Sequence, residues 1–125
     1  MDETALFFFN NHTEALPIYS KLEEMLSREI PGLKIKVQKS QITFINRRVF
    51  GCVSFLPVRK AKDRPPHFLT VTFGLPYRKE SPRIDAATEP YPRRWTHHVT
   101  VAGSDEVDEE LLAWLREAAE FAAVK

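Results

Sequence analysis

The sequence contains few of the residues that indicate covalent, redox or cofactor chemistry. Its single cysteine, Cys52, cannot form an internal disulfide, and its position in the apolar stretch 49–56 predicts a buried structural thiol. The four glycines are all isolated, which excludes the glycine-rich loops that bind phosphates. The serine-nucleophile pattern G-x-S-x-G and the ligand spacings of zinc sites are also absent. We therefore expect no metal, no cofactor and no familiar catalytic site.

Long apolar runs and a basic leader are missing as well. The run 5–9 near the N-terminus has five apolar residues, whereas about 20 are needed to cross a bilayer. Asp2 and Glu3 stand where a secretory signal would need basic residues. The chain has 125 residues, of which 43% are hydrophobic and 28% charged, and this fits one ordinary globular domain. We expect a single cytoplasmic domain spanning 1–125, with no membrane partner.

Apolar residues recur at helical spacing near both ends of the chain. Residues 6–9 predict a short turn of helix whose phenylalanines pack on the core. Thr13 is the expected N-cap of a longer helix, and the Pro-Gly pair at 31–32 ends it. Ser104 is the expected N-cap of a C-terminal helix. The buried stripes of the two long helices are predicted to be Leu16, Tyr19, Leu22, Met25, Leu26 and Ile30, and Val107, Leu111, Trp114, Leu115, Ala118, Phe121 and Ala122.

Between the helices the apolar spacing changes to two residues, which is typical of half-buried antiparallel strands. A hairpin turn is expected at 38–41, and the stretch 76–94, which has no clear period, is expected to be a long functional loop. Helices gathered on one face of an antiparallel sheet give an α+β fold, a two-layer sandwich. About five strands are predicted, at 33–37, 41–44, 49–56, 67–75 and 95–101.

If both helices cover one face of the sheet, alternation sends a threonine-rich, basic set of side chains to the other face. One interpretation is a solvated sheet face, because threonine suits exposed strands. The other is a platform for a ligand or partner, over which the 76–94 loop could fold. The residues of this polar face are Lys34, Lys36, Gln41, Thr43, Thr70, Thr72, Thr96, His98 and Thr100.

The segment Trp95-Thr96-His97-His98 holds the strongest candidates for site chemistry. Adjacent strand residues point to opposite faces, so the two histidines cannot readily bind one metal together. The alternation places Trp95 and His97 on the core side, and we expect His97 to be a core histidine. His98 points to the polar face, where it could contact a ligand or transfer a proton.

Charge is segregated along the chain although the formal net charge is only +1. Acidic residues prevail in the helical ends, and Asp108, Glu109 and Glu110 are expected to form a solvated helix face. The segment 34–64 carries nine basic residues against one acid. A basic surface is expected of proteins that bind phosphate-bearing partners, although basic residues also protect sheet edges. The candidate polyanion-binding residues are Lys34, Lys36, Arg47, Arg48, Arg59, Lys60 and Lys62.

Four segments together resemble a known family. They are VQKSQITF at 37–44, CVSFLPVR at 52–59, RWTHHV at 94–99 and DEELL at 108–112, which opens an alanine-rich helix. In these segments the chain resembles the bacterial family called domain of unknown function 5655. The resemblance implies a small cytoplasmic bacterial domain with no established activity. The signature-bearing positions it points to are Lys39, Gln41, Trp95, His97 and His98.

Three hypotheses follow for the function. The first is a non-enzymatic module that binds a small anionic ligand or a protein partner on the polar face, and a homodimer would form if that face pairs with a copy of itself. The second is weak nucleic-acid or polyanion binding through the basic 34–64 segment. The third is an enzyme with a site centred on His98. The ligand-binding candidates are Lys39, Gln41, Thr43, Arg93, Arg94, Trp95, His97 and His98.

Overall fold

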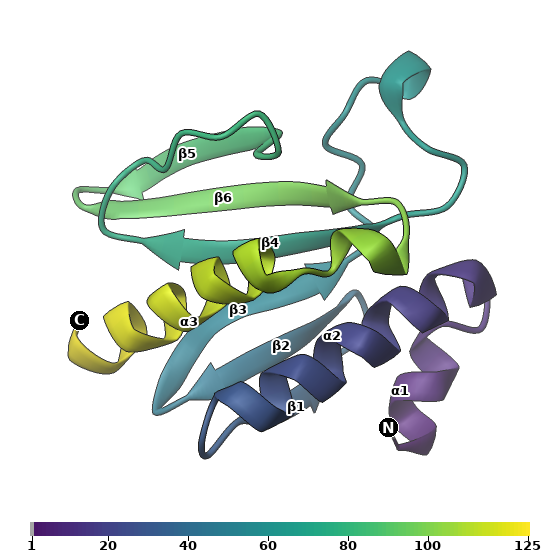
Figure 1. Cartoon of the computed structure of the whole chain (residues 1–125), viewed down its shortest axis with the longest axis horizontal. Helices are drawn as coiled ribbons and strands as arrows, with labels where there is room; N and C mark the ends of the chain where they lie inside the picture. The colour runs from purple at the N-terminus through teal and green to yellow at the C-terminus, as the bar shows by residue number, and fades with distance from the viewer. Residues whose placement is uncertain (1) are drawn as a thin grey trace.

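The computed structural model describes residues 2–125 as two layers, an antiparallel sheet with helices against one of its faces (Figure 1). The helices are α1 (Glu3–Phe8), α2 (Leu16–Glu29) and α3 (Glu109–Val124). The strands are β1 (Lys34–Val37), β2 (Gln41–Asn46), β3 (Arg48–Ser54), β4 (Leu69–Leu75), β5 (Ala86–Tyr91) and β6 (Arg94–Val101). Short 3₁₀ turns cover Thr13–Ala15, Ala61–Asp63 and Ser104–Glu106. Within the described range, no helix is both long and apolar enough to span a bilayer.

The sheet has the strand order β1-β2-β3-β4-β6-β5, and every neighbouring pair is antiparallel. The predicted two-layer α+β architecture is therefore confirmed, with six strands in place of about five. The additional strand, β5, lies inside the stretch 76–94, so the prediction of a continuous loop there is wrong. β5 is an edge strand with mostly exposed side chains, and it contains Pro90 where its pairing with β6 changes register. It therefore lacks the alternation by which the other strands are detected.

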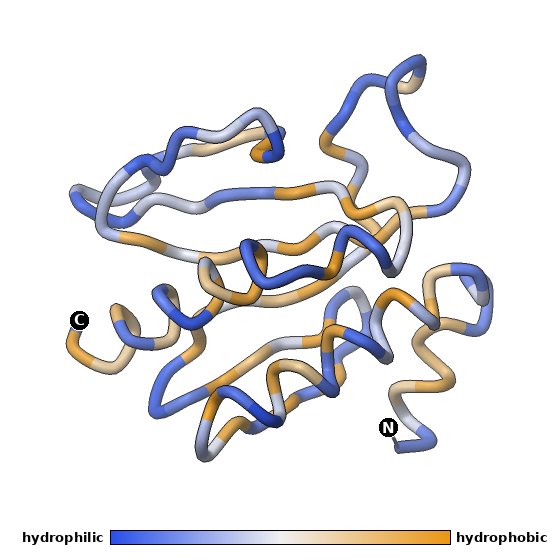
Figure 2. Tube along the Cα trace, viewed as in Figure 1, coloured by the Kyte–Doolittle hydropathy of each residue, from blue (hydrophilic) through white to orange (hydrophobic). Residues whose placement is uncertain are grey.

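The core lies between the sheet and the inner sides of α2 and α3. Ile42, Val53, Val71 and Val99 are paired in register across the four central strands, and all four are buried. Each fully buried side chain of this kind stabilises the fold by roughly 1.5–3 kcal/mol. In Figure 2 hydrophobic segments follow the central strands and the helices, whereas the loop from β3 to β4 is mostly hydrophilic.

Both long helices begin later than the sequence predicts. Thr13 and Ser104 each start a 3₁₀ turn, and neither caps an α-helix. The N-cap of α3 is Asp108, whose carboxylate accepts the backbone N–H of Leu111 at 3.0 Å. A carboxylate makes a stronger, charge-assisted cap bond than a serine hydroxyl. The predicted buried stripes are correct except that Leu16 and Phe121 are only half-buried. Ile18, Leu112 and Ala119 are buried in addition.

The segment 76–85 packs against α3 on the helix side of the sheet. It does not fold over the polar face, so that expectation is wrong. The Lys79 ammonium lies 2.9 Å from a carboxylate oxygen of Glu117 on α3. The Arg83 guanidinium lies 2.9 Å from a carboxylate oxygen of Asp108 and of Glu110. The first turn of α3 is therefore not a purely solvated acidic face, because its carboxylates attract the basic side chains of this segment.

The polar face carries the predicted side chains but is covered in part. Thr70 donates its hydroxyl hydrogen to the carbonyl oxygen of Leu56 at 2.6 Å, and Arg59 pairs with Asp85 at 2.9 Å. The segment after β3 therefore crosses the ends of β4 and β6 on the side away from the helices (Figure 1). Thr70 and Thr100 are buried as a result. This part of the face is not an open platform.

Candidate functional site

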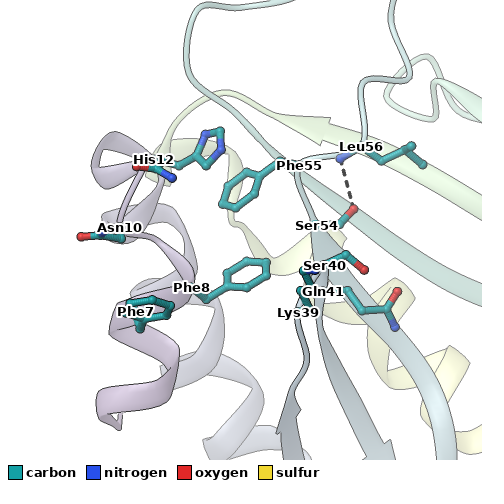
Figure 3. Close-up of a pocket in the computed structure, with 11 residues that line it drawn as sticks. Phe7, Phe8, Asn10, His12, Lys39, Ser40, Gln41, Ser54, Phe55 and Leu56 are labelled. Atoms are coloured by element: carbon teal, nitrogen blue, oxygen red, sulfur yellow. Dashed lines mark hydrogen bonds between the residues drawn. The ribbon is translucent and has the colours of Figure 1, made fainter.

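A groove of about 580 Å³ lies between α1 and the turn that joins β1 to β2 (Figure 3). One side is built from α1 and the residues after it, and the other from the β1–β2 turn and the end of β3. The lining residues are Phe7, Phe8, Asn10, Asn11, His12, Lys39, Ser40, Gln41, Ser54, Phe55 and Leu56.

Two of three consecutive phenylalanines, Phe7 and Phe8, line the aromatic side of the groove, and the third, Phe9, does not. Asp2 caps α1 by accepting the backbone N–H of Ala5 at 2.9 Å, which fixes where the helix begins. Successive helical side chains are about 100° apart, so three in a row cannot all face the core. Phe9 is buried, Phe8 is half-buried and Phe7 is 77% exposed. The expectation that all the phenylalanines of this turn pack on the core is therefore wrong for Phe7.

Phe55 is stacked against two rings from the N-terminal segment. The ring centroids of Phe55 and His12 are 3.8 Å apart with an interplanar angle of 17°, and those of Phe55 and Phe8 are 5.1 Å apart at 19°. Figure 3 shows the three rings as a column that joins α1 to the end of β3. Aromatic contacts of this kind contribute about 0.5–1.5 kcal/mol each beyond their buried area, so the groove wall is held in place.

The polar side of the groove is a tight hairpin turn with an ordered hydrogen-bond relay. The backbone N–H of Gln38 donates to the carbonyl oxygen of Gln41 at 2.8 Å, which places Lys39 and Ser40 at the tip. Gln41 Nε2 donates to Thr43 Oγ1 at 2.8 Å, and that hydroxyl donates to Gln38 Oε1 at 2.6 Å. The relay leaves the remaining N–H and the oxygen of the Gln41 amide for a ligand.

Lys39 gives the groove a positive charge. Among residues 2–125, no Asp or Glu side chain forms an ion pair with its ammonium, and none of the residues that line the groove is acidic. Aromatic walls offer apolar stacking surface, whereas the Lys39 ammonium attracts an anion. The arrangement is therefore suited to an organic ligand that carries a negative group. The part of the chain that the structure describes holds no cluster of three or more His, Cys, Asp or Glu that could bind a metal ion.

The other predicted ligand-binding residues lie outside the groove. Trp95 and His97 are on the helix side of the sheet, while Arg93 and Arg94 lie at the β5–β6 turn. His98 is on the polar face, where its Nδ1 lies 2.9 Å from Thr72 Oγ1. The structure thus brings only Lys39 and Gln41 together in one cavity, with Thr43 behind them.

His98 has a neighbourhood of its own on the polar face. Burial lowers its pKa, which favours the neutral ring that hydrogen-bonds Thr72. Cys52, the cross-strand neighbour of Thr72 on the other side, is half-buried where the sequence predicts a buried thiol, and desolvation raises the pKa of its thiol. A raised thiol pKa is typical of a structural cysteine. A catalytic role for His98 stays a prediction.

The predicted polyanion-binding residues are spread over three places. Lys34 and Lys36 are exposed on β1 at one edge of the sheet, and Lys60 and Lys62 are exposed near the 3₁₀ turn between β3 and β4. Arg59 is engaged with Asp85. The remaining two members of the set, Arg47 and Arg48, occupy the β2–β3 turn.

The aromatic side of the groove is not predicted from the sequence. The signal for it is the triplet Phe7-Phe8-Phe9 at the end of α1, since helical geometry turns one of three consecutive side chains outward. Phe55 and His12 gave no such signal. Their stacking depends on the approach of α1 to the end of β3, which local spacing does not encode.

A comparison with protein families gives one match that covers most of the chain. The family model described as Domain of unknown function (DUF5655) matches residues 6–122. No curated protein and no solved structure matches the chain. The matched range contains every residue that lines the groove. The match confirms the resemblance seen in the four sequence segments.

Proposed function

The chain belongs to the DUF5655 family, and we propose that it is a non-enzymatic binding module. Its ligand is an organic anion with an aromatic or apolar part, either a small molecule or the side chain of a partner protein. The site is the groove between α1 and the β1–β2 turn, with Lys39 and Gln41 on its polar side and Phe7 and Phe55 on its apolar side.

The observation that carries this proposal is the pairing of an unneutralised lysine with exposed aromatic surface. Phe7 is 77% exposed, and Leu56, on the opposite side of the groove, is also exposed. Large apolar side chains that gather around a concave site with a few polar groups are typical of binding sites. The stacked column of Phe8, Phe55 and His12 supports the wall, so little ordering is needed when a ligand enters.

The test uses anilinonaphthalene sulfonate, an aromatic anion whose fluorescence rises in apolar sites. We expect saturable binding to the folded chain. Lys39→Gln removes the charge that attracts the sulfonate, and Phe7→Ser removes one apolar wall. A lost contact with a charged group is worth about 1.5–3 kcal/mol, so Lys39→Gln is expected to weaken binding by about tenfold or more.

The matched control is Lys60→Gln, because Lys60 is also exposed and lies outside the groove. This variant is expected to bind the dye as the unaltered chain does. Loss of binding in Lys60→Gln, with no change in Lys39→Gln and Phe7→Ser, would place the site elsewhere and overturn the proposal. Circular dichroism of each variant confirms that the fold is intact.

A further inference from the structure

Two arginine pairs occupy two tight turns at the same end of the sheet. Arg47 and Arg48 lie in the β2–β3 turn, and Arg93 and Arg94 lie in the β5–β6 turn. In Figure 1 both turns lie at the end that carries the C-terminus, opposite to α1. This end is therefore separate from the groove. The two pairs are separated by 44 residues in the sequence, so their proximity is visible only in the fold.

The C-terminal end of α3 lies between the two turns. The guanidinium of Arg94 lies 5.1 Å from the ring centroid of Phe121, and the Lys125 ammonium lies 5.7 Å from the same ring. Arg48 donates a hydrogen bond to the carbonyl oxygen of Lys125. Burial, together with the like charges of Arg94 and Arg48, lowers the pKa of Lys125. Three cationic side chains, those of Arg48, Arg94 and Lys125, therefore gather around the end of α3.

Little acidic charge opposes this cluster. Within the described residues, none of the four turn arginines forms an ion pair with an Asp or Glu side chain. Glu89 accepts the backbone N–H of Arg93 at 3.1 Å, and Glu120 lines a small cavity together with Arg47. These two carboxylates leave an excess of positive charge at this end of the molecule.

Exposed apolar side chains lie among the cations. Val49 follows Arg48, Tyr91 precedes the β5–β6 turn, and Val124 precedes Lys125; they are 51%, 70% and 83% exposed. Tyr91 offers a flat ring on which a nucleic-acid base can stack, and base stacking on aromatic side chains is tolerant of sequence. Arginine guanidiniums suit phosphate oxygens because they donate two parallel hydrogen bonds.

The placement of two arginine pairs on two separate turns suits a polymer of phosphates. Arg48 begins β3 and Arg94 begins β6, with only β4 between these strands. Two interstrand spacings place the Cα atoms of the two arginines roughly 10 Å apart along the sheet. Arginine side chains on neighbouring turns can each contact a different phosphate of one flexible strand.

We propose that this arginine end, made of Arg47, Arg48, Arg93, Arg94 and Lys125 with Tyr91, binds the phosphate backbone of single-stranded nucleic acid. The four arginines contact phosphates, and the Tyr91 ring stacks on a base. The site is independent of the groove and takes a polymer, where the groove takes an organic anion.

Fluorescence anisotropy of a labelled oligothymidylate of about 20 nucleotides tests this inference. Four phosphate contacts on a single strand predict a logarithmic salt slope of about −2.8, which weakens binding about 50-fold between 50 and 200 mM salt. The double variant Arg47→Gly, Arg93→Gly removes two contacts and is expected to reduce the slope to about −1.4, or about sevenfold. Both residues have φ of 59°, a left-handed conformation that glycine adopts readily, so this variant keeps its fold.

The control Lys60→Gln, Lys62→Gln removes two exposed charges elsewhere and is expected to leave the slope unchanged. Lys39→Gln is also expected to bind the oligonucleotide normally, so failure of the groove proposal and failure of this one are distinguishable. Absence of binding at 50 mM salt would overturn the inference, as would equal slopes in the two double variants. Tighter binding to a duplex, or binding to phosphatidylserine vesicles without binding to the oligonucleotide, would equally overturn it.

Discussion

Lys79 donates its backbone N–H to Nε2 of His97 at 2.9 Å, and this bond joins the segment 76–85 to the interior of the sheet. His97 is fully buried, and its ring is stacked on Phe73 with centroids 5.0 Å apart. The acceptor nitrogen must be unprotonated, so the bond requires the neutral ring. The prediction that His97 lies on the core side is therefore correct, and its role is to hold a loop.

The His97 bond predicts a loss of stability in acid. Burial lowers the pKa of His97 below 6.5, so the unfolded chain binds more protons than the folded one as the pH falls below about 6.5. Stability is complete above that pH and falls by up to about 1.4 kcal/mol per pH unit below it. Burial lowers the pKa of His98 as well, so two groups contribute. Urea unfolding at pH 7.5 and 5.5 measures the effect.

Two variants separate the contribution of His97 from that of His98. His97→Gln keeps an acceptor for the Lys79 N–H but cannot titrate. We therefore expect the pH dependence of stability to become smaller, and the part contributed by His98 to remain. His97→Phe leaves that N–H without its acceptor and is expected to cost about 1–3 kcal/mol at pH 7.5. An unchanged pH dependence in His97→Gln would show that this histidine does not carry the effect.

The start of α3 gives a second prediction. Asp108 caps the helix through Leu111 and binds Arg83, so Asp108→Ala is expected to cost about 1–2 kcal/mol. Ser104→Ala is expected to change stability by less than about 0.5 kcal/mol, because Ser104 makes no cap. Thermal or urea unfolding of the two variants decides between the two caps, and a larger loss in Ser104→Ala would contradict the structure.

Gly51 allows the central strand β3 to pack closely against its neighbour β4. A Cβ atom at this position would lie 2.7 Å from the backbone oxygen of Thr72 and 3.6 Å from Leu115 Cδ2. Gly51→Ala is therefore expected to cost about 1–3 kcal/mol through overpacking. Gly74→Ala on β4 is the control, since its nearest neighbour would be the oxygen of Trp95 at 3.9 Å. Equal unfolding midpoints for the two variants would contradict this packing.

The left-handed arginines predict an unusual gain from glycine. Arg47 has φ of 59°, which costs a residue with a Cβ atom roughly 1–2 kcal/mol, whereas glycine pays about 0.5–1 kcal/mol in unfolded-chain entropy. Arg47→Gly is therefore expected to be neutral or to stabilise the fold by up to about 1 kcal/mol. Gly32 has φ of 74°, and an added Cβ atom would lie in open space. Gly32→Ala is therefore expected to destabilise the fold by about 1 kcal/mol, through the backbone conformation alone. Thermal unfolding of the two variants measures both, and the opposite pair of signs would contradict the backbone geometry.

The sequence predicts most of the fold because burial imposes a period on it. The alternation of Ile42, Phe44, Val71 and Phe73 marks strands with one buried face, and the helices show apolar stripes. β5 escapes detection because an edge strand with few buried side chains has no period to read. The local rule for a cap does not decide the start of α3, because Ser104 and Asp108 both satisfy it. The stronger bond of a carboxylate cap and the contact with Arg83 favour Asp108.

The candidate sites are predicted less completely because they depend on which segments meet. Lys39 and Gln41 could be identified from the hairpin, but the approach of Phe55 to α1 could not. The arginine pairs at 47–48 and 93–94 were assigned to different hypotheses, and the strand order that places their turns at one end is not readable from charge patterning.

The central claim is that the groove between α1 and the β1–β2 turn is the binding site. An amide NMR titration of isotope-labelled protein with anilinonaphthalene sulfonate tests it most directly. We expect saturable shifts at Phe8, His12, Lys39 and Gln41, with no change at the arginine end. Shifts confined to the residues around Arg94 and Lys125, or no shifts at saturating dye, would contradict it.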